Sequence, residues 1–255
     1  MEKKVEIHLL TFNEEDILPY TLRHYQTFAS LIVVHDAGST DRTRRIVEKA
    51  GPGVLLQDWD TKGQLNDALA MQLKDTCWLG TKADWVGVFD ADEFWYFPMG
   101  AEFTLGVYDV AGYPVIKPHG FSMFSSTFPT TQGQIYEEVK AGVRDVWYAK
   151  PILFAPARLR SINFDPGAHG CSVVLKDGAM VKFPVEVGTP SLPPTYLLHY
   201  RHLGSLERIA RRNDLKRARL ADINLACGWG HTTPGMQQAS EQREYFKLHL
   251  EQVIP

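Results

Sequence analysis

Four short β-rich runs recur through the first part of this chain, and helical patterns separate them. The runs cover Val5–Thr11, Leu31–His35, Val54–Gln57 and Trp85–Phe89. Strands that alternate with helices at this spacing form a parallel sheet with right-handed crossover connections. The sequence therefore predicts an α/β fold with a mostly parallel sheet flanked by helices, over residues 1–97.

The helices between these runs can be placed from their apolar spacing and their end signals. Apolar residues from Leu18 to Ala29 line one face of the first helix, and Asn13 is expected to be its N-cap. The second helix is expected to begin near Ser39 and to stop by Gly51, where a Gly-Pro-Gly sequence follows. The third is expected over about 64–76.

The second half of the chain, residues 98–255, has a different character. Proline and glycine are frequent up to about residue 195, and helical patterns return over about 205–220 and 239–252. Such stretches build loops and short strands over an α/β scaffold, where binding surfaces are often found. We expect an irregular lobe with C-terminal helices that is continuous with residues 1–97.

The bulk composition restricts the possible partners and compartments. Lys and Arg number 27 against 30 acids, a net charge of −3, which gives no electrostatic reason to expect nucleic acid. No apolar stretch reaches the roughly 18–20 residues of a transmembrane helix, and no secretory signal is visible. The three cysteines are odd in number, far apart in the sequence and in no C-x-x-C pair, which favours a reducing compartment. The prediction is a cytoplasmic protein with no transmembrane segment.

The fourth β-rich run ends abruptly in three acids, Asp90, Asp92 and Glu93. Carboxylates at the end of a buried strand cost free energy unless they are hydrogen-bonded or bind a cation. Ligands of open α/β sheets sit beyond the carboxyl ends of the strands. Since side chains alternate along a strand, Asp90 and Asp92 share a side and can hold one hard divalent ion. The alternative is a solvated acidic turn or a helix cap.

Three motifs at successive strand ends carry a family resemblance. They are Asn-Glu-Glu within residues 11–15, Asp-Ala-Gly-Ser-Thr-Asp at 36–41, and Asp-Ala-Asp at 90–92. In this order the motifs resemble those of the GT-A glycosyltransferases, specifically the family 2-like group, over about residues 5–97. The resemblance implies the GT-A fold, Rossmann-like with a mostly parallel sheet, and it makes residues 98–255 the acceptor-side lobe.

The resemblance also implies a nucleotide-sugar donor, with uridine as the first expectation for the base. Asp36 is expected to accept hydrogen bonds from the base or the ribose. The predicted donor-binding residues are Thr11, Asn13, Glu14, Asp36, Gln64, Asn66, Ala91 and Lys150. Several of these residues, Glu14 among them, could instead serve a helix end.

Two aspartates rarely complete a coordination sphere, so a third ligand is expected from the second half of the chain. His169 lies in a stretch that resembles the Pro-Gly-x-His segment of family 2-like proteins, and His199 is the second candidate. An imidazole among oxygen ligands favours Mn²⁺ over Mg²⁺. The predicted metal ligands are Asp90, Asp92 and His169, with Mn²⁺ or Mg²⁺ as cofactor.

The implied reaction is a metal-dependent transfer of a sugar from a nucleoside-diphosphate sugar, UDP-sugar first, to an acceptor hydroxyl. Inversion at the anomeric carbon is expected by analogy and requires a carboxylate base. Asp165 and Glu138 are the candidates for that base. The acceptor stays open among a glycan, a lipid, a protein and a small molecule. The alternatives are a haloacid dehalogenase-like phosphatase and a non-catalytic nucleotide- or carbohydrate-binding protein.

Overall fold

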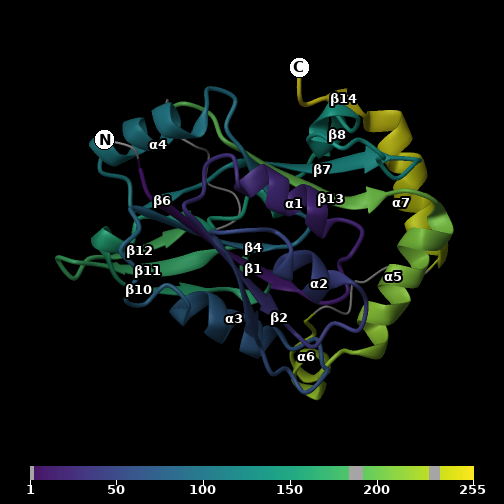
Figure 1. Ribbon diagram of the computed structural model, residues 1–255, viewed down its shortest axis with the longest axis horizontal. Coiled ribbons are helices and arrows are strands. Elements are labelled where there is room, and N and C mark those ends of the chain that lie inside the picture. Colours follow the sequence, from purple (N-terminus) through teal and green to yellow (C-terminus); the bar gives the residue numbers. More distant parts are fainter. Residues whose placement is uncertain (1–2, 184–191, 230–235) are drawn as a thin grey trace.

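The computed structural model describes residues 3–183, 192–229 and 236–255 of the chain. A six-stranded sheet with the strand order β3-β2-β1-β4-β9-β6 runs through its centre (Figure 1). Strands β1 to β4 are parallel, and β9 is antiparallel to both of its neighbours, β4 and β6. The bounds are β1 Val5–Thr11, β2 Leu31–Asp36, β3 Val54–Asp58, β4 Trp85–Asp90, β6 Val115–Ile116 and β9 Leu153–Phe154. The predicted mostly parallel sheet is confirmed.

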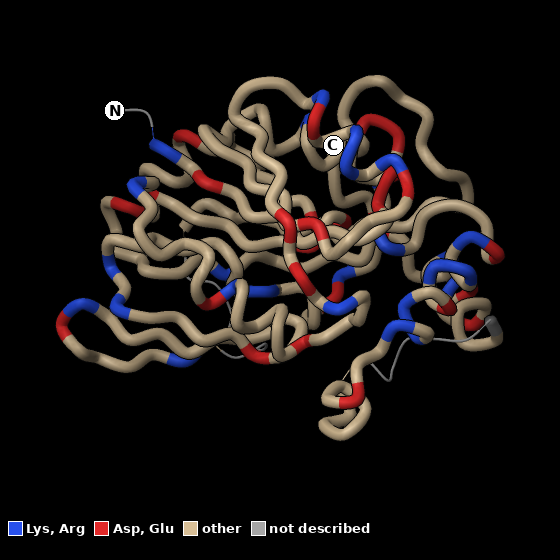
Figure 2. Tube along the Cα trace, turned by 60° about the horizontal axis from the view of Figure 1, so that its bottom comes forward, with Lys and Arg blue, Asp and Glu red and all other residues tan. Residues whose placement is uncertain are grey.

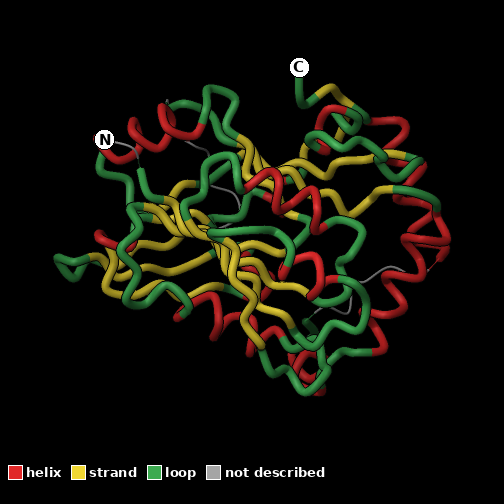
Figure 3. The backbone as a smooth tube through the Cα atoms, in the orientation of Figure 1, coloured by secondary structure: helices red, strands yellow, loops and turns green. Residues whose placement is uncertain are grey.

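Helices cover both faces of this sheet (Figure 3). Tyr25 of α1 (Leu18–Tyr25) stacks on Phe89 with ring centroids 5.0 Å apart. Lys74 of α3 (Asp67–Thr76) pairs with Asp90, the next residue of β4. Because side chains alternate along a strand, α1 and α3 lie on opposite faces. Helix α2 (Thr43–Glu48) lies beside α1.

Asn13 does not cap the first helix, so that expectation is wrong. Helix α1 begins at Leu18, and the residue before it makes no side-chain cap hydrogen bond. Asn13 instead has a positive φ of 53°, which asparagine tolerates, and its side-chain Oδ1 accepts from the Thr40 backbone N–H at 2.7 Å. The same oxygen accepts from Asp41 N at 3.3 Å, so Asn13 holds the loop after β2 against the loop after β1.

A second sheet joins the two halves of the chain. Its order is β14-β8-β7-β13-β5, and β5 follows β4 after a short turn. A three-stranded sheet, β10-β11-β12, packs near α3. The bounds are β5 Glu93–Tyr96, β7 His119–Ser125, β8 Ala141–Arg144, β10 Leu159–Phe164, β11 Cys171–Leu175, β12 Met180–Phe183, β13 Tyr196–Leu203 and β14 Glu251–Gln252. Since β6 and β9 complete the first sheet, both halves share one framework, and a boundary at residue 97 stays a prediction.

The C-terminal helices lie across the edge of the molecule where β1 ends (Figure 1). Ser205 caps α5, and after that helix the chain pairs with the segment before α3, where Leu65 N donates to Arg219 O at 2.6 Å. The remaining helices are α4 Ala101–Val110, α5 Leu206–Ala218, α6 Asp222–Cys227 and α7 Met236–His249, with short 3-10 turns at Ile135–Glu137, Val146–Tyr148, Pro156–Arg158 and Pro166–Ala168. Within the described ranges, every helix is too short or too polar to cross a bilayer.

Candidate functional site

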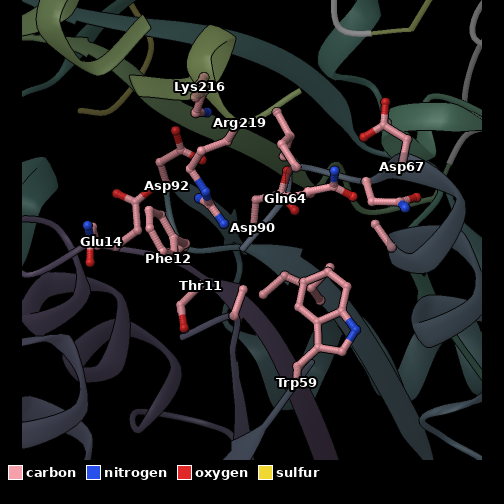
Figure 4. Close-up of a pocket in the computed structure, with 18 of the residues that line it drawn as sticks. Thr11, Phe12, Glu14, Trp59, Gln64, Asp67, Asp90, Asp92, Lys216 and Arg219 are labelled. Carbon is pink, nitrogen blue, oxygen red and sulfur yellow. The ribbon is translucent and has the colours of Figure 1, made fainter. Parts of the chain in front are cut away.

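A pocket lies beyond the carboxyl ends of β1 and β4. The β1–α1 loop, residues 59–71, the β4–β5 turn and one face of α5 form its walls (Figure 4). Eight of the residues predicted from the sequence line this pocket: Thr11, Asn13, Glu14, Gln64, Asn66, Asp90, Ala91 and Asp92. Ala37, from the segment 36–41, lines the pocket as well, so the loops that carry the three motifs meet at one place, as expected for a parallel sheet.

Asp90 is the more accessible of the two paired acids. Its side chain is 45% exposed, and Oδ1 lies 3.1 Å from the Lys74 ammonium. Burial alone would raise the pKa of Asp90, but Lys74, and next Lys150, outweigh it and hold the pKa at about 2. Asp90 is therefore ionised at neutral pH and presents negative charge to the pocket.

Asp92 is buried in an ionic cluster. Its Oδ2 lies 2.9 Å from the Arg212 guanidinium, and its Oδ1 lies 3.5 Å from His199 Nε2. Burial raises the pKa of Asp92, but His199 and Arg212 together bring it well below the usual value. Arg212 also binds Glu14 at 2.6 Å. One guanidinium thus ties the β1–α1 loop to the acidic turn.

His199, and not His169, is the histidine that lies beside the acids. Antiparallel pairing of β13 with β5 places His199 opposite Glu93, one residue after Asp92. His169 is hydrogen-bonded through Nδ1 to the Trp147 carbonyl at 2.6 Å, and its ring meets the Trp147 ring edge-on. Its neighbours 167 and 168 line the pocket, but His169 does not.

Two predicted donor contacts, Asp36 and Lys150, have other partners. Asp36 is buried, accepts from the Ser39 N–H at 3.0 Å and pairs with Arg44 at 2.9 Å. Its carboxylate therefore stabilises the turn after β2. Lys150 is buried against Glu93 at 2.5 Å. Neither residue lines the pocket. Glu93 also accepts from the Asp90 backbone N–H at 2.9 Å, so Lys150 supports the acidic turn from behind.

The two candidate bases lie away from the pocket. Glu138 is exposed and accepts a hydrogen bond from the Thr130 backbone N–H at 3.0 Å. Asp165 is exposed, and its backbone N–H donates to the Gly170 carbonyl at 2.9 Å. Neither lines the pocket, so the structure gives no support to a catalytic role for either at this site.

Cationic and aromatic residues that were not predicted also line the pocket. Arg212, Lys216 and Arg219 come from α5 and its end, and Trp59 comes from the segment after β3. Burial lowers the pKa of Lys216 to about 8, with further lowering by Arg212. The Arg219 guanidinium lies 3.1 Å from the centroid of the Phe12 ring. Figure 2 shows a group of basic residues at the right-hand end of the molecule, where α5 lies, besides others that are spread over the rest of the chain.

The sequence did contain a signal for these cations. Arg208, Arg212 and Lys216 recur every four residues, which places them on one face of a helix. A basic run of this kind is usually a solvated helix face. Only the contacts of α5 with the β1–α1 loop distinguish such a face from one that lines a binding pocket.

Comparisons with known proteins give partial matches. No family model matches the chain. A stretch of 92 residues is 32% identical to a TPR repeat-containing protein of Synechococcus elongatus, and it covers 35% of this chain and 21% of that protein.

Solved structures also match in part, and in each case the chain spans less than half the length of the matched structure. TarS of S. aureus in complex with UDP matches with a TM-score of 0.38 at 18% identity, over 60% of this chain and 47% of that one. A glucosyl-3-phosphoglycerate synthase from Mycobacterium tuberculosis, with Mn²⁺, UDP and glucosyl-3-phosphoglycerate, matches at 0.32 and 15%, over 47% and 44%. The mannosyltransferase PcManGT from Pyrobaculum calidifontis, with GDP-Man and Mn²⁺, matches at 0.34 and 19%, over 49% and 36%.

Since every one of these TM-scores is below 0.5, we infer the activity of the chain from its own pocket residues.

Proposed function

We propose that this chain is a metal-dependent glycosyltransferase that moves a sugar from a nucleoside-diphosphate sugar, UDP-sugar first, to an acceptor hydroxyl. The observation that carries the proposal is one pocket that is lined by the acids Asp90 and Asp92, by the bases Lys216 and Arg219 and by the aromatic rings of Phe12 and Trp59 (Figure 4). A nucleotide-sugar has an aromatic base, an anionic diphosphate and a polar sugar, and each finds a suitable partner there.

The pocket residues suggest how the donor is held. Trp59 and Phe12 offer rings on which a base can stack, an interaction worth about 1–3 kcal/mol per base. Lys216 and Arg219 supply charge and N–H donors for phosphate oxygens. Such donors stabilise negative charge as it grows on the departing diphosphate.

Asp90, Asp92 and His199 are the ligands that we propose for Mn²⁺ or Mg²⁺; His199 does not line the pocket, but its Nε2 lies 3.5 Å from Asp92 Oδ1. Two carboxylates and one imidazole favour Mn²⁺, and the matched synthase and mannosyltransferase structures contain that ion. When bound, the metal would offset the charge of the leaving diphosphate. Arg212 already pairs with Asp92 at 2.9 Å, so we infer that the guanidinium and the metal compete for this carboxylate.

We further propose that transfer inverts the anomeric configuration, as the GT-A family 2-like resemblance implies. The acids that line the pocket are Glu14, Asp67, Asp90 and Asp92, whereas Asp165 and Glu138 lie elsewhere. Glu14 and Asp67 are thus the pocket carboxylates that our proposal does not assign to the metal. The anomeric coupling constant of the product, measured by NMR, distinguishes inversion from retention.

One screen tests the proposed function. Purified protein is incubated with UDP-sugars and GDP-sugars, with Mn²⁺ or EDTA, while thermal stability and nucleotide release are followed. We expect stabilisation by a nucleoside diphosphate only with Mn²⁺, lost in Asp90→Asn. The matched control is Asp177→Asn, which changes an exposed acid in the β11–β12 turn and should behave as wild type.

Other outcomes separate the alternatives. Failure of every nucleoside diphosphate to stabilise the protein with Mn²⁺ refutes the donor site. Phosphate release from simple phosphomonoesters, without donor binding, favours the phosphatase. Tight donor binding with no release of nucleotide, even with glycan, lipid, protein and small-molecule acceptors, favours the non-catalytic binding protein.

A further inference from the structure

A second cluster of metal-ligating side chains lies inside the protein, apart from the pocket. His8 on β1, His35 on β2 and Cys77 just after α3 each offer a ligand atom, and these atoms lie within 4.8 Å of one another. Both histidines are at most 3% exposed. The three residues do not line the pocket that holds Asp90 and Asp92.

The sheet register explains why the cluster forms. Leu10 of β1 pairs with His35 on one side and with Asp90 on the other. His8 precedes Leu10 by two residues, so it points to the same face of the sheet as His35. This is the face that α3 covers, and Cys77 follows the end of α3 one turn after Lys74. The cluster thus lies behind the acidic pocket, under the same helix.

A chain of hydrogen bonds orients His8. Thr81 Oγ1 donates to Glu6 Oε2 at 2.6 Å, and Glu6 Oε1 binds His8 Nε2 at 2.8 Å. An ionised carboxylate only accepts hydrogen bonds, so His8 carries its proton on Nε2 and its lone pair on Nδ1. That Nδ1 lies 2.9 Å from His35 Nε2. Carboxylate–histidine pairs of this kind are the usual outer shell of a metal-binding imidazole.

The cluster contains no charge that would explain its burial as an ion pair. Burial lowers the pKa of His8 and, with His8 as a further cause, lowers the pKa of His35 to about 4. Burial raises the pKa of the Cys77 thiol to about 12. Two neutral imidazoles and one thiol are therefore present at neutral pH. In addition, His35 Nδ1 is buried with no hydrogen-bond partner among the described residues.

We propose that His8 Nδ1, His35 Nε2 and Cys77 Sγ bind a zinc-class divalent cation. Ligand atoms of tetrahedral zinc lie about 3.3–3.6 Å apart for the usual bond lengths, so the two imidazole nitrogens need to separate by about 0.4 Å from 2.9 Å. The Cys77 S–H bond breaks, an S–Zn bond forms and that proton leaves to solvent. His35, whose Nε2–H faces the lone pair of His8 Nδ1, changes tautomer: its Nε2 proton is given up and its unpartnered Nδ1 takes one, so that Nε2 can bind the ion and one proton is released in total. A water molecule takes the fourth position. Nitrogen and sulfur ligands select zinc over the oxygen-preferring Mn²⁺ and Mg²⁺.

Such an ion would join β1, β2 and α3 directly beneath the pocket. Helix α3 carries Lys74, which pairs with Asp90, and it begins next to Asn66, which lines the pocket. Zinc binding should therefore stabilise the fold and the α3 wall of the pocket, whether or not the chain transfers sugars.

Cobalt provides the test, because a Co²⁺–thiolate bond gives a charge-transfer band that carboxylate sites do not give. EDTA-treated protein is titrated with Co²⁺ in the presence of excess Mg²⁺, which occupies oxygen sites. We expect this band together with visible bands of tetrahedral cobalt, one proton released per ion bound, and displacement by Zn²⁺. Zn²⁺ alone should raise the melting temperature.

Variants assign the ligands. The band should be absent in Cys77→Ser and retained in the matched control Cys227→Ser, which changes an exposed thiol at the end of α6. Glu6→Gln should weaken Co²⁺ binding by about 10–100-fold, as loss of an outer-shell partner does. His35→Gln, checked for folding by circular dichroism, should lose the tetrahedral bands.

The absence of a thiolate–cobalt band in folded wild-type protein overturns the proposal, as does an unchanged band in Cys77→Ser. Neither result bears on UDP binding, so failure of the zinc site and failure of the transferase assignment are distinguishable.

Discussion

Replacing Arg212 with methionine should destabilise the protein strongly. The guanidinium contacts Glu14 at 2.6 Å and Asp92 at 2.9 Å, and the side-chain exposures are 18% for Arg212, 16% for Glu14 and 4% for Asp92. Without Arg212, two carboxylates remain facing the same buried space. Methionine fills much of the volume of the arginine stem, so the loss reports the charge more than the packing.

The size of the effect follows from the burial. Breaking a buried ion pair by removing one partner costs about 3–5 kcal/mol. Because Glu14 and Arg212 keep some contact with solvent, we expect the lower end, about 3 kcal/mol of unfolding free energy. For a chain of this size each kcal/mol shifts the melting temperature by about 2–4 °C, so the expected loss is about 6–12 °C.

The pH dependence has a definite sign. Asp92 has a lowered pKa in the folded wild type, so its stabilising contribution is present above the unfolded pKa of about 3.9 and is lost as pH falls through the folded value. The difference between Arg212→Met and wild type should therefore be largest near neutral pH and shrink in acid. Mn²⁺ should restore more stability to the variant than to wild type, because it can take the place of the guanidinium.

Urea denaturation at several pH values measures these differences. Arg208→Met is the matched control, since Arg208 lies one helical turn earlier and pairs with Asp16 at exposures of 29% and 54%. Its loss should be about 1 kcal/mol or less. If Arg212→Met costs no more than this control near neutral pH, the buried bridge between Glu14 and Asp92 is refuted.

Three further predictions concern the donor pocket. Asp90→Asn should weaken Mn²⁺-dependent UDP binding, measured by calorimetry, by at least about 100-fold. Loss of an outer-shell partner costs up to about 100-fold, and loss of a direct ligand should cost no less. Binding within a factor of a few of wild type would exclude Asp90 as a ligand. The pKa of Lys216 is about 8, so UDP affinity should fall as pH rises from about 7 to 9, because the ammonium loses its proton. Lys216→Met should bind more weakly with a flatter pH profile, and an unchanged profile would show that another group titrates. Trp59→Ala should weaken UDP binding by about 1–3 kcal/mol and should abolish the quenching of Trp fluorescence that UDP causes. The effect on folding should be small, because Trp59 is partly exposed. Undiminished UDP binding would place the base elsewhere.

Local features of the sequence were sufficient for the four parallel strands of the main sheet and for one wall of the pocket. Strand β1 spans the predicted Val5–Thr11, and β4 extends the predicted run by a single residue, to Asp90. Apolar runs bounded by polar residues define such strands without help from distant parts of the chain. Thr11 and Glu14 line the pocket for the same reason, since a loop that follows a parallel strand must lie at its carboxyl end.

The choice between the two histidines depended on strand register, which the sequence does not show. His199 reaches Asp92 because β13 pairs with β5 across more than one hundred residues of chain. The Pro-Gly loop did bring residues 167 and 168 to the pocket, but it turned His169 to the Trp147 carbonyl. Asp36 lies outside the pocket lining for a more local reason, because its carboxylate accepts from the Ser39 N–H and pairs with Arg44 within the turn after β2.

The charges of the pocket give an independent reason to expect a metal. Four acids and four bases line it: Glu14, Asp67, Asp90 and Asp92, with Lys74, Arg212, Lys216 and Arg219. The pocket is thus close to neutral before any ligand enters, because the bases of α5 balance acids that the motifs place on the opposite wall. A nucleoside diphosphate brings at least two further negative charges into this partly buried space, where uncompensated charge is costly. A divalent cation that enters with the diphosphate cancels this excess. In the empty pocket, Arg212 of α5 balances Glu14 and Asp92 instead.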